Sequence, residues 1–69
     1  MDRYEMTVYW SAEDGRYIVE VAELPGCMAD GKTRMEAIGN AETVIAEWID
    51  TAKMLGRTIP EPKKRERTA

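Results

Sequence analysis

The sequence predicts a small α+β domain in which a three-stranded antiparallel sheet carries one long helix on one face. Apolar and polar residues alternate at the beginning of the chain, as they do in half-buried strands. After position 33, apolar residues recur every three or four positions, as they do in an amphipathic helix. Pro25 and Gly26 form a turn signal between these two patterns.

The first two strands are expected to form a hairpin. Residues 4–10 alternate, and Asp14-Gly15 is a turn signal before residues 17–24, which are rich in β-branched types. Pairing Trp10 with Tyr17 places the apolar positions of both strands on one face, so the sequence pattern predicts this register of the hairpin. Trp10 is therefore expected in the core.

The opposite face of this hairpin is more apolar than a solvated surface and is a candidate for contact with another chain. Its candidate residues are Tyr9, Ile18, Glu20 and Ala22. Residues 27–30 are expected to form a short third strand, with Cys27 as a small buried residue.

The helix is expected to begin at Arg34, because Thr33 and Glu36 have the spacing of a capping box. In such a box the glutamate reaches back to the N–H of the cap residue itself. Gly56 is expected to end the helix. Gly39 costs roughly 1 kcal/mol relative to alanine, so it predicts a close approach to a strand or another subunit.

One stripe of the helix is apolar and is expected to lie on the sheet. It comprises Ile38, Ala41, Val44, Ile45, Trp48, Ala52 and Leu55. Three acidic residues fall mostly off this stripe and form a second candidate partner-binding surface: Glu42, Glu47 and Asp50.

The charge is divided unevenly along the 69 residues. The net charge is -3, but residues 1–59 hold 6 Lys and Arg against 11 Asp and Glu. The expected division is a domain over residues 1–62 and a basic, unstructured tail over residues 63–69. An acidic body argues against nucleic acid as its ligand and favours a basic partner.

So short a chain has a marginal core, and one cysteine without any histidine supports neither a disulfide nor a zinc site. Self-association, as a dimer or tetramer, is therefore expected. No apolar run is long enough to span a bilayer and no signal peptide is evident, which favours the cytoplasm.

The sequence offers little catalytic chemistry. Without histidine, the usual general base and the usual catalytic triads are absent, so neither an enzyme nor a cofactor is expected. The strand and helix order resembles part of an RNase H-like fold, but a two-metal nuclease needs converging carboxylates, and the first strand has Met6, Thr7 and Val8 at its middle. Residues 26–33 match the Walker A pattern but lack a parallel sheet around them, so they are interpreted as a turn and a helix cap.

Three strings occur in order: Leu24-Pro25-Gly26-Cys27, Gly31-Lys32-Thr33 and Ala37-x-x-Asn40-Ala41. They are followed by Trp48-Ile49, Gly56 and Ile59-Pro60-Glu61-Pro62. With these strings the chain resembles the N-terminal domain of HicB-type antitoxins, from about Tyr4 to Pro62. The resemblance implies a protein that inhibits a HicA toxin, a small basic ribonuclease that cuts mRNA using a histidine, by covering its RNA-binding surface.

Members of this family usually carry a C-terminal DNA-binding domain. The chain ends seven residues after Pro62, so that domain is expected to be absent, and operator binding by this chain alone is not expected. Three alternatives stay open: a solitary HicB-like binding module without a toxin, an accessory protein that binds nucleic acid through the basic tail, and a metal-dependent nuclease.

Overall fold

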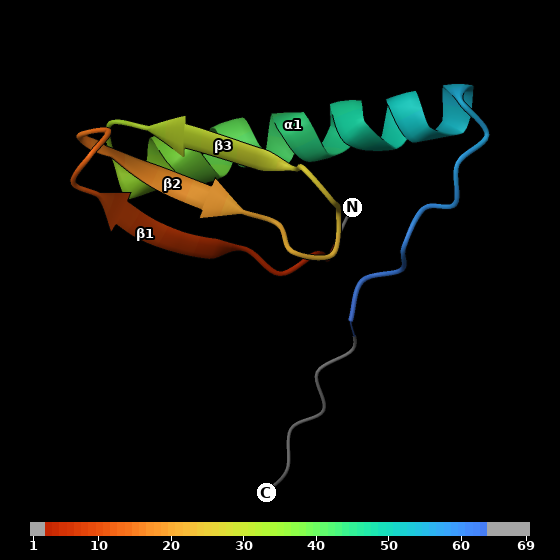
Figure 1. Ribbon diagram of the computed structural model, residues 1–69, viewed down its shortest axis with the longest axis horizontal. Helices are drawn as coiled ribbons and strands as arrows, with labels where there is room; N and C mark the ends of the chain where they lie inside the picture. The colour runs from red at the N-terminus through yellow and green to blue at the C-terminus, as the bar shows by residue number, and fades with distance from the viewer. Residues whose placement is uncertain (1–2, 64–69) are drawn as a thin grey trace, which may run out of the picture.

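The computed structural model describes residues 3–63 and confirms the expected α+β fold class (Figure 1). The chain forms β1 (Thr7–Ser11), β2 (Arg16–Glu20), β3 (Met28–Gly31) and α1 (Arg34–Met54) in that order. The strands are antiparallel and lie in the order β1-β2-β3, with α1 on one face of the sheet.

The predicted register of the hairpin is confirmed. Trp10 pairs with Tyr17 and Val8 pairs with Val19. At the turn, the Gly15 N–H donates to the Ser11 carbonyl at 2.8 Å, and Gly15 adopts a φ of 62°, which glycine accepts without strain.

Strand β1 is shorter than the expected residues 4–10, and β3 has the expected length but begins one residue later. Strand β2 is shorter than the expected residues 17–24, because the chain makes two consecutive turns after it. The Leu24 N–H donates to the Val21 carbonyl at 3.1 Å, and the Cys27 N–H donates to the Leu24 carbonyl at 2.9 Å. These bonds use backbone groups that the prediction had assigned to a ladder over residues 17–24. The turns bury Leu24 completely, and Cys27 is buried as expected at 2% exposure.

The helix ends lie where the sequence places them, with one difference in detail. The Thr33 hydroxyl accepts from the Glu36 N–H at 3.0 Å, but the Glu36 carboxylate accepts from the Lys32 N–H at 3.1 Å instead of from the N–H of Thr33. At the other end, Gly56 has a φ of 67°, and the Arg57 N–H donates to the Ala52 carbonyl at 2.8 Å. This is the bonding pattern of a Schellman motif.

The core has two parts along α1. Under the first half of the helix, Ala37 and Ala41 pack on Val19 of the central strand. Under the second half, Ile45 packs on Leu24 and the other residues of the double turn. The turn segment between β2 and β3 therefore completes the layer beneath the helix.

The prediction of a core position was wrong for Trp10, which is 53% exposed, and for Leu55, which is 60% exposed. Helix α1 lies along β3 and β2 and barely covers β1 (Figure 1). Trp10 shares the face of Val8, which packs on the core beneath the helix, so Trp10 is on the helix side of the sheet but beyond the helix. Its indole meets the Tyr17 ring edge-on, with centroids 5.1 Å apart. Leu55 is the C-cap residue, where the chain already turns away from the stripe.

The ends of the described chain are tied to one carboxylate. Glu23 accepts from the Glu5 N–H at 3.2 Å and from the Lys63 N–H at 2.6 Å. The Tyr4 hydroxyl also donates to the Pro60 carbonyl. The segment after α1 thus returns to the beginning of the chain, whereas the rest of the expected basic tail, residues 64–69, lies outside the described residues.

The close approach expected at Gly39 occurs instead at Gly31. Gly39 is exposed, and a Cβ added there would meet nothing within 4 Å, so that expectation was wrong for the single chain. A Cβ on Gly31 would lie 2.5 Å from the Ala37 nitrogen. Glycine at position 31 is what lets α1 begin directly on the end of β3.

These two glycines should respond oppositely to alanine. Gly39→Ala should raise the free energy of unfolding by roughly 1 kcal/mol through helix propensity, and the melting temperature by about 4–8 °C. Gly31→Ala should lower the free energy of unfolding by about 1–3 kcal/mol, because α1 must move off β3. Thermal and urea denaturation of both variants would measure this. A loss of stability in Gly39→Ala would mean that another subunit fills the space beside Gly39 in solution.

Candidate partner-binding surfaces

The face of the sheet opposite α1 brings together three of the four predicted sheet residues. Tyr9 pairs with Ile18 across β1 and β2, and Glu20 is two residues further along β2. The Tyr9 hydroxyl donates to a Glu20 carboxylate oxygen at 2.5 Å. Ala22 is exposed but lies in the turn after β2, so it borders this open face and is not part of the sheet.

Strand β3 adds residues to the open face that the sequence analysis missed. Met28 pairs with Glu20 and is 51% exposed, and Asp30 pairs with Ile18. The Asp30 carboxylate lies 2.6 Å from Nε of Arg16. The sequence could have indicated these two residues, because the alternation of a strand places Met28 and Asp30 on the face of Ile18 once the strands are paired.

A shallow depression of about 370 Å³ lies on this open face. It is lined by Asp14, Arg16, Ile18, Met28, Ala29 and Asp30. The open face therefore combines an apolar middle with an ion pair at its border.

The three predicted helix residues are exposed but do not form one cluster. Glu42 and Glu47 are five residues apart, which is about 140° around a helix of 3.6 residues per turn, and Asp50 projects between them on the outer side. Among the described residues, none of these three carboxylates forms an ion pair. They make the exposed side of α1 acidic over a broad area, on the opposite side of the domain from the open sheet face.

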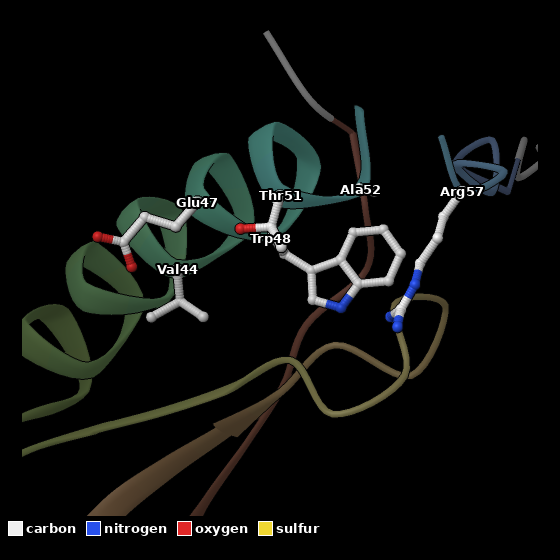
Figure 2. Close-up of a pocket in the computed structure, with 6 residues that line it drawn as sticks. All are labelled: Val44, Glu47, Trp48, Thr51, Ala52 and Arg57. Atoms are coloured by element: carbon white, nitrogen blue, oxygen red, sulfur yellow. The ribbon is translucent and has the colours of Figure 1, made fainter. Parts of the chain in front are cut away.

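A second depression, of about 260 Å³, lies beside the C-terminal half of α1 (Figure 2). Figure 2 shows the Trp48 indole pointing from the helix towards the Arg57 side chain, which comes from the segment after the helix. The Trp48 N–H donates to the Pro25 carbonyl at 2.9 Å, and the indole is half-buried, which agrees with the expected core position. Glu47 and Thr51 complete the border of this hollow.

Sequence reasoning missed Arg57 as a neighbour of this depression. Its position depends on Gly56, whose positive φ turns the chain sharply at the end of the helix. The sequence indicates that turn, but it does not indicate which way the side chain after it will point.

The described part of the chain can be compared with the metal-site and Walker A alternatives. No three cysteine or acidic side chains among residues 3–63 are grouped so that they could hold a metal ion. The Walker-like string forms a turn, strand β3 and a helix cap, and so is not a loop wrapped around a phosphate. Within the same residues, α1 is not long and apolar enough to cross a membrane.

The Tyr9–Glu20 contact should be visible in a titration. The hydrogen bond to Glu20 raises the pKa of the Tyr9 phenol above its usual 10.0, with smaller effects from desolvation and from the charges of Glu20 and Asp14. Since the folded chain holds this proton more tightly, the contact stabilises the fold below about pH 10 and is lost as pH rises through the raised pKa.

We expect Glu20→Ala to lower the pKa of Tyr9 towards its usual value, because the variant removes both the acceptor and the negative charge. NMR titration of the phenol resonances above pH 9 would measure the change, with Tyr9→Phe assigning the signal. Glu13→Ala, which removes an exposed acidic side chain from the turn after β1, is the matched control. An unchanged titration in Glu20→Ala would contradict the contact.

Comparison with known proteins agrees with the resemblance noted in the sequence. A family model described as the HicB-like antitoxin of bacterial toxin-antitoxin systems matches residues 4–69. The UPF0150 protein Ta0767 of Thermoplasma acidophilum is 41% identical over 56 residues, 81% of this chain and 81% of that protein. The UPF0150 protein ssl0259 of Synechocystis is 32% identical over 57 residues, 83% of this chain and 77% of that protein. No solved structure matches significantly. The chain therefore belongs to the family of HicB-like antitoxins.

Proposed function

We propose that this protein is the antitoxin of a toxin-antitoxin pair and that it inhibits a HicA-type, mRNA-cleaving toxin by covering the toxin's RNA-binding surface. The family match over residues 4–69 carries the proposal, because that family is defined by its role in toxin-antitoxin systems. Inhibition by occlusion needs a surface and no catalytic group. We propose accordingly that the chain is not an enzyme, needs no cofactor and acts in the cytoplasm.

The charge distribution supports a basic partner. The outer side of α1 presents Glu42, Glu47 and Asp50 to solvent, and residues 1–59 carry 11 acidic against 6 basic side chains. A ribonuclease that binds RNA must have a positively charged surface. An acidic domain attracts that surface over a distance, which accelerates the encounter, and then competes with RNA for it.

The open sheet face is the second surface available to the toxin. It offers the apolar contacts of Ile18 and Met28 beside the acidic Glu20. We propose that the toxin binds one of these two surfaces and that the protein also self-associates, as a dimer or tetramer. We further propose that this chain alone does not bind nucleic acid, since its body is acidic.

The direct test mixes the purified protein with the HicA-type toxin encoded beside it. We expect a stable complex in size-exclusion chromatography and loss of RNA cleavage as the protein reaches the toxin's concentration. A toxin that stays active with saturating protein, or the lack of any such neighbouring gene, would contradict the proposal and favour a solitary binding module.

Charge reversal on the helix should weaken the complex. The triple variant Glu42→Lys, Glu47→Lys, Asp50→Lys should slow association by at least about tenfold at low salt, with a smaller effect at high salt, because the attraction is electrostatic. Surface plasmon resonance at two ionic strengths would measure this. Glu13→Lys with Glu61→Lys, two exposed positions outside both surfaces, adds four positive charges against the six of the triple variant and so controls for most of the change in net charge.

A sheet-face variant separates the two surfaces. Ile18→Asp with Glu20→Lys changes the central strand of the open face and leaves α1 unaltered. If this variant loses affinity and the helix variant does not, the toxin binds the sheet. Unchanged affinity in both variants would remove both surfaces from the proposal.

A further inference from the structure

The two edge strands of the sheet, β1 and β3, have different surroundings. Helix α1 packs against β3, and the Asn40 side-chain amide donates to the Asp30 carbonyl at 2.8 Å. One backbone acceptor of β3 is therefore occupied by a side chain of the helix. At the other edge, no strand within residues 3–63 pairs with the outer side of β1. Figure 1 shows β1 as the strand furthest from the helix.

Strand β1 has none of the features that usually protect an exposed edge. Soluble proteins block such edges with lysine, proline, inward-pointing charges or a bulge, because the unpaired N–H and C=O groups otherwise accept another strand. Residues 7–11 are Thr-Val-Tyr-Trp-Ser, without a charge, proline or glycine. They pair with β2 residue for residue, without a bulge.

Both faces beside this edge carry exposed aromatic side chains. Trp10 is 53% exposed on the helix side, where α1 leaves β1 uncovered, and Tyr9 is 41% exposed on the open face. Val8 lies next to Trp10 on the helix side and is half-buried. A strand added to β1 would find apolar side chains on both of its faces.

We propose that β1 pairs antiparallel with β1 of a second copy, which joins two sheets into one of six strands. This inference deepens the self-association proposed above and rests on it. With Tyr9 on the two-fold axis, Val8 lies opposite Trp10 of the second copy and Thr7 lies opposite Ser11 of the second copy. Apolar side chains then meet apolar side chains on the helix side, and hydroxyl groups meet on the open face.

The charges of the chain favour this surface for a second copy. Two chains of net charge -3 repel one another, and both the outer side of α1 and the open face carry carboxylates. Residues 7–11 are neutral, so two copies of β1 meet without facing like charges. Since α1 lies over β3 and β2, the helices of the two copies stay apart, and the space between them holds Trp10 and Val8 from each chain.

The test is self-association of the intact protein without toxin. Sedimentation equilibrium should show a dimer or a larger assembly, and Trp10→Lys should raise the dissociation constant at least about tenfold, because it places a charge against Val8 of the second copy. Met54→Lys is the matched control, since Met54 is 86% exposed at the far end of α1. It should leave the dissociation constant unchanged.

Hydrogen exchange of the unmodified protein gives an independent readout, in case Trp10→Lys fails to fold. Amides of β1 should exchange more slowly as the concentration rises through the dissociation constant, whereas those of β3 should not change. A protein that stays monomeric would contradict both the β1 pairing and the proposed self-association. A dimer whose β1 amides gain no protection would contradict only the β1 pairing. Neither outcome affects the proposal of toxin inhibition.

Discussion

The rest of the structure depends on a mismatch of length between the helix and the sheet. Helix α1 has 21 residues and is about 30 Å long, whereas strands of 4 or 5 residues reach only about 15 Å. Half of the apolar stripe would therefore have nothing beneath it. The double turn after β2 fills this place, with Leu24 fully buried and the Pro25 carbonyl bonded to Trp48. The connection between β2 and β3 thus supplies the sheet side of one of the two parts of the hydrophobic core.

The sideways position of the helix determines what the domain can offer to other proteins. Because Gly31 lets α1 begin directly against the end of β3, the helix lies over that side of the sheet and leaves the opposite edge bare. The acidic residues of the helix are then separated from the neutral strand β1. A small domain of this shape presents an acidic surface and an uncharged strand on different sides.

The sequence predicts those parts of the structure that follow from local periodicity and capping chemistry. An alternation of two specifies which residues face together, so the pairing of Trp10 with Tyr17 could be derived, and Thr33 and Gly56 mark the helix ends by their own hydrogen bonds and φ. Periodicity shows which face of the sheet a residue lies on, but it does not show which strands the helix covers. It therefore placed Trp10 on the correct face and did not show that the helix leaves Trp10 uncovered. The residues after Glu20 are equally apolar in a strand and in a buried turn, and only tertiary packing decides between the two.

The hydrogen bonds of Glu23 bring the first and last described parts of the chain close together. Because one carboxylate holds the backbone at both Glu5 and Lys63, the chain enters and leaves the domain at nearly the same point. A short linker between the two ends of the described segment, residues 3–63, would close it into a ring, and a new opening in the exposed turn before Arg16 would then give a circular permutant with every packed element intact. For the same reason the domain could be inserted whole into a surface loop of a host protein without forcing the ends of that loop apart.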